Sequence, residues 1–171
     1  HHADRVAALY DDSQGRHIEN LTNIDPLTSH GIVGCPCLWM LGFPDQALRL
    51  HEATEAHVRA RAHPFGLCYL LVHGSWVFDF CGEPDQTLSH AEEGERLGRA
   101  HRMPLFSEVI GPLFRATAWV RAGRTSEAIP QLRDSLRKWS ALGGNLGTPY
   151  WKAVLAEAIA GSGDVDEGLR L

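Results

Sequence analysis

Histidine and cysteine are the residues of this sequence best suited to bind a metal, and the chain holds ten histidines and four cysteines. A structural zinc site needs paired ligands, such as Cys-x2-Cys followed by a second pair at regular spacing. Cys35-Pro36-Cys37 has the wrong spacing, and Cys68 and Cys81 lie in an apolar stretch where a thiol acts as a small hydrophobe. We therefore predict no metal site and no cofactor.

The histidines are predicted to be solvated or structural. Those on the expected outer helices stand among Glu and Arg, which indicates a solvated helix face; they are His51, His57, His63, His90 and His101. His73 alone has strongly apolar neighbours, and such a histidine is usually satisfied by a local hydrogen bond.

No pattern typical of an enzyme is present. The sequence lacks Gly-x-Ser-x-Gly, His-Glu-x-x-His and Walker motifs. Adjacent acids, as at Glu92-Glu93, diverge on a helix and cannot work as an acid–base pair. The glycine loop at residues 143–147 matches no nucleotide-binding pattern and indicates the end of a helix. We expect no catalytic activity from this chain.

Composition places the chain among folded, soluble proteins. Its 171 residues are 44% hydrophobic and 22% charged, which excludes disorder and suits one domain or one array of small repeats. The net charge of −5 has the wrong sign for a nucleic-acid surface. The most apolar stretch, residues 65–82, is interrupted by His73, Ser75 and Asp79, so no membrane span is expected. Few cysteines and no secretion signal favour reduced thiols and a cytoplasmic location.

The elements that would position any site are repeated. Gly42, Gly82, Gly123 and Gly163 follow one another at spacings of 40, 41 and 40 residues. After each comes a short segment rich in Pro, Asp, Thr or Ser and then Gln or Glu, which is typical of one helix ending and another beginning. Two columns of small residues keep the same spacing and would let the paired helices cross closely; they are Cys35, Ser75, Ala116 and Ala156, and Ala47, Thr87, Ala128 and Gly168. The neighbouring aliphatic column, Leu48, Leu88, Ile129 and Leu169, is expected to face the core.

The predicted fold is all-α, a right-handed α-solenoid of antiparallel helix–turn–helix repeats with a period of about 40 residues. We expect outer helices over 44–62, 84–102 and 125–142, and inner helices over 29–41, 65–81, 105–122 and 149–161. Residues 1–28 would hold the end of a preceding helix and a loop over 11–25, and residues 29–171 the array, in units 29–63, 64–103, 104–147 and a truncated 148–171. Pro112 and Pro130 fall inside predicted helices and should bend or delay the third unit.

With these glycines and small columns in place, the chain resembles the tetratricopeptide repeat family from about Ser29 onward. It departs from that family in its longer period and in lacking most of the large family-typical residues. Phrases such as Trp39-Met-Leu-Gly-Phe-Pro-Asp-Gln-Ala-Leu48 are also similar to the C-terminal repeats of bacterial cyclase–ATPase signalling proteins and of large ATP-dependent transcriptional activators. The resemblance implies that the chain is a fragment of a longer protein whose catalytic domains lie outside it.

The resemblance also implies a concave groove lined by the inner helices. Positions thirteen, six, three and two before each turn glycine would line it; the candidate partner-binding residues are Trp39, Tyr69, Trp76, Asp79, Thr117, Arg121, Tyr150 and Glu157. Aromatic side chains beside charges suit a groove that anchors a protein partner. The same aromatics could instead fill the core between units, and the sequence does not choose between these two interpretations.

The sequence thus predicts a noncatalytic scaffold whose partner is a protein or an adjacent domain of the same polypeptide. The alternative is a sensor that holds a small-molecule effector near Trp76, Asp79 and Arg121. Exposed end helices would offer a route to a homodimer. Neither a nucleic acid nor a membrane is expected as a direct partner.

Overall fold

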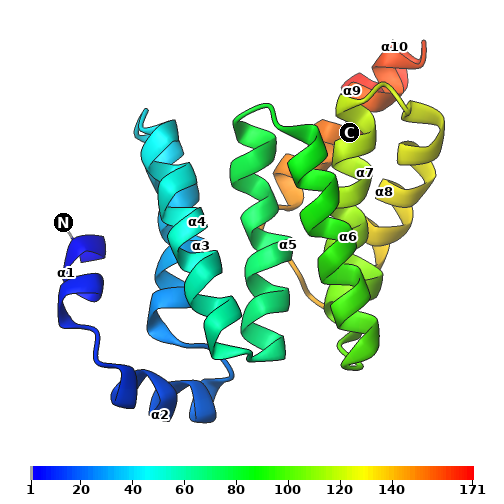
Figure 1. Ribbon diagram of the computed structural model, residues 1–171. Helices are drawn as coiled ribbons and strands as arrows, with labels where there is room; N and C mark the ends of the chain where they lie inside the picture. Colours follow the sequence, from blue (N-terminus) through cyan, green and yellow to red (C-terminus); the bar gives the residue numbers. More distant parts are fainter. Residues whose placement is uncertain (1) are drawn as a thin grey trace.

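A computed structural model describes residues 2–171, and this part of the chain consists of helices and the turns between them, with no β-strand (Figure 1). The elements in order are α1 (His2–Leu9), α2 (Asp12–Thr22), α3 (Pro26–Met40), α4 (Pro44–Arg61), α5 (Pro64–Phe80), α6 (Pro84–Ala100), a π-helical turn η1 (Leu105–Ile110), α7 (Gly111–Arg121), α8 (Thr125–Ala141), α9 (Thr148–Gly161) and α10 (Val165–Arg170). The all-helical class predicted from the sequence is confirmed, and helices α3, α4, α5, α6, α8 and α9 begin and end close to their predicted boundaries.

The repeated glycines end helices, as predicted. Gly42, Gly82, Gly123 and Gly163 have φ values of 86°, 77°, 74° and 108°, in the left-handed region that other residues rarely adopt. At Gly82 the amide donates to the Asp79 carbonyl, and the next amide, that of Glu83, donates to the Phe78 carbonyl. The same pair of bonds recurs at the other three glycines and satisfies carbonyls that the helix end would leave free. These turns set each following helix beside the one it leaves.

The expected loop over residues 11–25 is wrong, because most of it forms helix α2 (Figure 1). Asp11 caps this helix by accepting a hydrogen bond from the Gln14 amide at 3.0 Å. Asn23 ends it with a φ of 63°. Asn23 therefore terminates a helix instead of lying within a loop, and Gly15 lies inside the helix.

The proline in the third unit delays its inner helix. Residues 105–110 adopt the wider π-helical turn η1, and the α-helix α7 begins only at Gly111. Pro112 lies in the first turn of α7, directly after this wider turn. The helical segment itself begins near the predicted residue 105, and only its α-helical part starts later, while α8 runs on through Pro130.

The interior lies between successive helices. Its largest fully buried side chains include Leu70, Leu71, Phe106, Leu113, Phe114, Leu132 and Trp151. The two columns of small residues are buried as expected, apart from the partly exposed Ala156. The aliphatic column is half-buried at Leu48, Leu88 and Ile129, but Leu169 is exposed, because no described helix lies over that face of α10.

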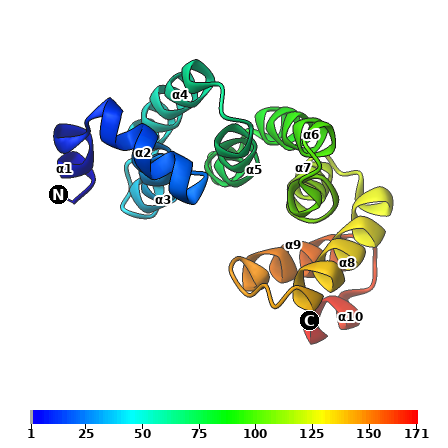
Figure 2. The same ribbon diagram turned by 90° about the horizontal axis from the view of Figure 1, so that it is seen from below.

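The helix pairs follow one another along an arc (Figure 2). In this view α4 and α6 lie on one side of the row, α3, α5 and α7 on the other, and α9 turns back toward α5. Stacking of Trp76 in α5 on Trp151 in α9, with ring centroids 5.5 Å apart, agrees with that turn. Within residues 2–171 no helix combines the length and the apolar character needed to cross a bilayer.

Candidate functional site

Four of the residues singled out from the sequence form one hydrogen-bonded group, which we call the Asp79 cluster: Asp79, Arg121, Tyr150 and Glu157. The Asp79 side chain is almost completely buried in the last turn of α5. Its Oδ1 accepts a hydrogen bond from Arg121 Nε at 3.0 Å, and its Oδ2 accepts one from the Tyr150 hydroxyl. Arg121 Nη1 donates onward to Glu157 Oε2 at 2.6 Å. Helices α5, α7 and α9 are joined in this way.

The surroundings raise the pKa values of Tyr150 and Arg121 in this cluster. Burial raises the pKa of Tyr150 far above its ordinary value, and the adjacent Asp79 charge raises it further, so the phenol stays a donor. Burial lowers the pKa of Arg121, but its hydrogen bonds to Asp79 and Glu157 outweigh that effect and raise the pKa overall. Arg121 therefore neutralises the buried Asp79, while the Glu157 carboxylate reaches solvent with its side chain 61% exposed.

Aromatic side chains lead from α3 to this cluster. The Trp39 ring lies 4.8 Å from Phe80, and Phe80 lies 5.7 Å from Tyr150, measured between ring centroids. Trp76 packs edge-on to Tyr150 at 6.3 Å and stacks on the buried Trp151. Trp39, Phe80, Trp76 and Tyr150 are all half-buried. Each therefore packs on an aromatic ring of another unit and still presents part of its surface to solvent.

Two of the predicted groove residues lie apart from the Asp79 cluster. Tyr69 is in the N-terminal half of α5, where its ring packs against His73 at 4.2 Å and against Phe65. Thr117 is completely buried and donates its hydroxyl to the Leu113 carbonyl at 2.9 Å, so it is not available to a partner. The position six residues before each turn glycine has a different environment in each unit. Helix α7, which carries Thr117, is packed between several helices, whereas α9 is open to solvent at Glu157.

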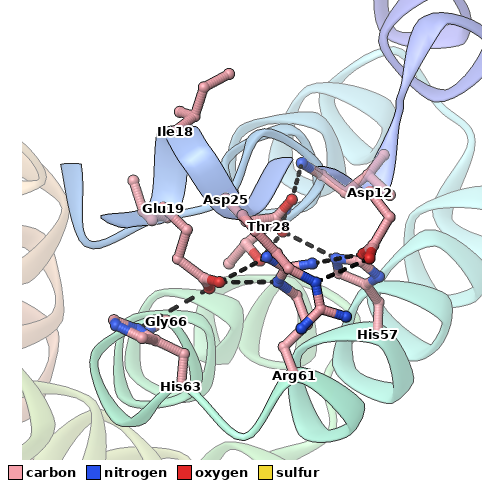
Figure 3. A network of polar contacts seen from close by, with 12 residues as sticks. Asp12, Ile18, Glu19, Asp25, Thr28, His57, Arg61, His63 and Gly66 are labelled. Carbon is pink, nitrogen blue, oxygen red and sulfur yellow. Dashed lines mark hydrogen bonds and ion pairs between the residues drawn. The ribbon is translucent and has the colours of Figure 1, made fainter. Parts of the chain in front are cut away.

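A second polar group, which the sequence analysis missed, centres on Arg61 at the end of α4 (Figure 3). The Arg61 side chain is only 6% exposed. It donates to Glu19 Oε2 from Nη2 at 2.6 Å and from Nε at 3.0 Å, and to Asp12 Oδ1 at 2.8 Å. Both acceptors belong to α2, so we call these three residues the Arg61 cluster. It fastens the unpredicted helix to the following unit.

Asp25 lies beside the Arg61 cluster and caps α3 (Figure 3). Its buried carboxylate accepts hydrogen bonds from the Thr28 amide and hydroxyl, and its Oδ2 lies 2.9 Å from His57 Nε2. Burial by itself would raise the pKa of Asp25, but the hydrogen bonds from Thr28 outweigh this effect, and the pKa is lowered overall. Asp25 before Pro26 is a recognisable helix start, so the cap could have been predicted. Its partner His57 could not.

The prediction that the histidines of the outer helices are solvated is wrong for most of them. His51 and His90 are buried and pack their rings against Phe78, with centroids 4.8 and 4.7 Å apart. His57 pairs with Asp25, and His63 Nδ1 accepts a hydrogen bond from the Gly66 amide at the start of α5. Helices α4 and α6 pack on α5 with these rings, so charged neighbours along one helix were a misleading signal. His101 is exposed, as expected.

The remaining thiol and imidazole groups agree with their predicted roles. His73 Nδ1 lies 3.1 Å from the Tyr69 carbonyl, which is the local hydrogen bond expected of a histidine in an apolar context. The four cysteines are free. Burial raises the pKa values of Cys35 and Cys68 to about 12, so these thiols are packing groups and not nucleophiles.

Both polar groups join helices: the Asp79 cluster links α5, α7 and α9, and the Arg61 cluster links α2 to α4. Comparison of the chain with models of protein families, with curated proteins and with solved structures gives no match in any of the three.

Proposed function

We propose that this chain is a noncatalytic interaction scaffold, a right-handed solenoid of tetratricopeptide-like repeats that binds a protein partner or an adjacent domain of its own polypeptide. The observation that carries the proposal is the Asp79 cluster. Three helices from successive units contribute to it, and its outer members, Arg121 and Glu157, are accessible to solvent. A partner that contacts them would sense the relative position of three units at once.

The chemistry around the cluster suits a protein partner. Partner surfaces are commonly anchored by aromatic and arginine side chains set in a well-packed neighbourhood. Trp39, Phe80 and Tyr150 supply such a row, and Met40, which follows Trp39 at the end of α3, exposes an apolar side chain. The three aromatic residues keep their positions without a partner, because each packs on an aromatic ring of another unit, so little of their ordering entropy is lost on binding.

A signalling role is the finer part of the proposal and rests on resemblance. The turn glycines and the phrase around Trp39 to Leu48 are similar to repeats of bacterial cyclase–ATPase proteins and ATP-dependent activators. In such a protein a cytoplasmic repeat region would transmit the bound state of a partner to a catalytic domain elsewhere in the polypeptide. Docked units that share one buried carboxylate, Asp79, provide a rigid path for that signal.

The alternative, a small-molecule effector held by Trp76, Asp79 and Arg121, is less well supported. Both Asp79 oxygens already accept hydrogen bonds, from Arg121 and Tyr150, and Trp76 is stacked on Trp151. An effector would have to displace these contacts. A surface hollow of about 670 Å³ beside α6 is lined by other residues, among them Glu92, Arg96 and Arg115.

Native mass spectrometry of the chain, before and after incubation with lysate of its host, distinguishes these functions. The scaffold predicts a protein captured in a defined ratio, with no retained small molecule. A small molecule that copurifies and survives desalting would favour the sensor. A dimer of the isolated chain would instead indicate self-association through end helices such as α10, which exposes Leu169.

A further inference from the structure

Three side chains with metal-binding atoms converge between α4 and α6, and we call them the histidine cluster: His51, Glu55 and His90. His51 and Glu55 lie one turn apart on α4, and His90 comes from α6. One ligand atom from each lies within 4.8 Å of the other two. The cluster is distinct from the Asp79 and Arg61 clusters and shares no residue with them.

The hydrogen bonding of His90 directs a lone pair at Glu55. Its Nδ1 lies 3.0 Å from the Gln86 carbonyl, which can only accept, so Nδ1 carries the proton. In the neutral ring Nε2 is then an acceptor, and it faces Glu55 Oε2 at 3.2 Å. Two acceptors at that distance repel each other unless a second proton on His90 or a metal ion lies between them. Metal-bound histidines commonly show this arrangement, with the other ring nitrogen donating to a carbonyl.

His51 supplies an unsatisfied second imidazole. The residue is 2% exposed, and neither ring nitrogen has a hydrogen-bond partner. Its Nε2 lies 3.6 Å from Glu55 Oε2, beyond hydrogen-bonding distance. A buried imidazole without partners is costly, so a ligand that both rings could share would lower the free energy of the folded state.

Helix α5 provides the space for this ring. A Cβ at Gly74 would lie 2.2 Å from His51 Cε1, so only glycine allows the imidazole to sit against α5. Phe78, one turn further along α5, packs against the rings of both His51 and His90. The rings are therefore held in place by packing before any ligand binds.

The spacing fits a small divalent ion. Zn²⁺ binds imidazole nitrogen and carboxylate oxygen at about 2.0–2.2 Å, which puts neighbouring ligand atoms of a tetrahedron about 3.3 Å apart. The two distances to Glu55 Oε2, 3.2 and 3.6 Å, bracket that value. The other carboxylate oxygen, Oε1, accepts from Arg59 Nε at 2.9 Å, and Arg59 also pairs with Glu93. A ligating carboxylate held by a hydrogen bond of this kind is typical of metal sites.

We propose that His51 Nε2, Glu55 Oε2 and His90 Nε2 bind one Zn²⁺ ion, with water in the fourth position. The ion links the outer helices of two successive units and so clips the first unit of the array to the second. The site stands independently of the scaffold function proposed above. Loading it favours the folded state, because the ligands are brought together only there.

Calorimetric titration of the full chain with Zn²⁺ tests the site. The background protein carries His1→Ala, His2→Ala and Cys37→Ser, because a His-His pair and an exposed thiol bind zinc in any context. The site predicts one ion per chain and a higher midpoint of thermal unfolding with zinc. His51→Ala and His90→Ala each weaken binding by at least about 10-fold. The matched control His101→Ala, an exposed histidine just after α6, leaves the affinity unchanged.

Glu55→Gln guards against variants that fail to fold, since the amide keeps the shape of the side chain. It should also weaken Zn²⁺ binding at least about 10-fold, with the far-ultraviolet circular dichroism unchanged. Substitution with Co²⁺ should give the visible absorption of a four-coordinate ion in the background protein and none in this variant. Equal zinc binding by the background protein, His90→Ala and Glu55→Gln would overturn the site. The contact between His90 and Glu55 would then be explained as an ion pair with a protonated imidazole.

Discussion

Tyr150 of α9 donates its hydroxyl proton to Asp79 of α5, a hydrogen bond between residues 71 positions apart in the chain. Arg121 of α7 shares the same carboxylate. The middle and last units of the array are thus joined through one buried group. Asp79 therefore stabilises the stacking of units, in addition to positioning the surface around Arg121 and Glu157.

Replacing Asp79 should therefore destabilise the whole stack. Asp79→Ala leaves Tyr150 and Arg121 without their acceptor, and we expect a loss of about 2–4 kcal/mol in the free energy of unfolding. Tyr150→Phe alone should cost about 1 kcal/mol. Because both variants remove the same hydrogen bond, the double variant should lose less than the sum. Urea unfolding measures all three, and strict additivity would contradict the shared bond.

Arg61 should hold α2 in place. Arg61→Met removes the donor to Glu19 and Asp12, and leaves the largely buried Glu19 with only the imidazole of His63, whose Nδ1 lies 4.0 Å from Glu19 Oε1. We expect the amides of α2 to exchange at least about 10-fold faster with deuterium, because a loss of about 1.4 kcal/mol of local stability has that effect. Arg16→Met is the matched control, since the exposed Arg16 pairs with Asp12 within α2 alone. Equal exchange in both variants would show that packing alone docks the helix.

His73 should make the fold sensitive to acid. Burial lowers the pKa of His73 to about 4, below its ordinary value near 6.5. Between those values the unfolded chain binds a proton that the folded chain does not, so the free energy of unfolding falls as pH falls through this range. The loss from this residue approaches roughly 3 kcal/mol near pH 4, and the stability is fully present above pH 6.5. His73→Phe should flatten this part of the pH profile in chemical unfolding. An unchanged slope would assign the acid sensitivity to other groups.

The turn glycines should be intolerant of a side chain. Gly82→Ala forces alanine to a φ of 77°, which costs about 1–2 kcal/mol, measurable as a lower midpoint of thermal unfolding. Gly161→Ala is the control, because Gly161 ends α9 with open space around its Cα and lacks a positive φ. Alanine there should be neutral or stabilise by about 0.5 kcal/mol. Destabilisation of similar size in both variants would contradict the turn geometry.

The parts of the fold that could be predicted are those encoded over short distances. A glycine at C′, followed closely by the next helix start, fixes a turn within a few residues, so α4, α5, α6, α8 and α9 were predicted to within two residues at each end. Helix α2 was missed because the side chain that links it to the array, Arg61, lies 42 residues after its hydrogen-bond acceptor Glu19 in the sequence. Local polarity and a glycine at position 15 gave no indication of that partner.

The site was predictable where the predicted groove positions of successive units meet. Asp79, Arg121 and Glu157 were selected by their distance from the turn glycines, and stacking of the units brings them together. Thr117 was misplaced because position within a unit does not reveal how many neighbours cover it. The histidine cluster was missed because His51 and His90 come from different units, and charged residues beside them indicated solvent.

The central claim is that a partner docks on the surface around Glu157 and Met40, and paired substitutions test it most directly. Met40→Asp and Glu157→Lys alter that surface. The control for Met40→Asp is Leu142→Asp, because the two residues are 69% and 65% exposed. The control for Glu157→Lys is Glu127→Lys, because the two side chains are 61% and 52% exposed. The measurement is the affinity of each variant for the protein captured by the unaltered chain. We predict at least about a 10-fold loss for Met40→Asp and Glu157→Lys, with little change in the controls. Equal affinities across all four variants would contradict the proposed surface.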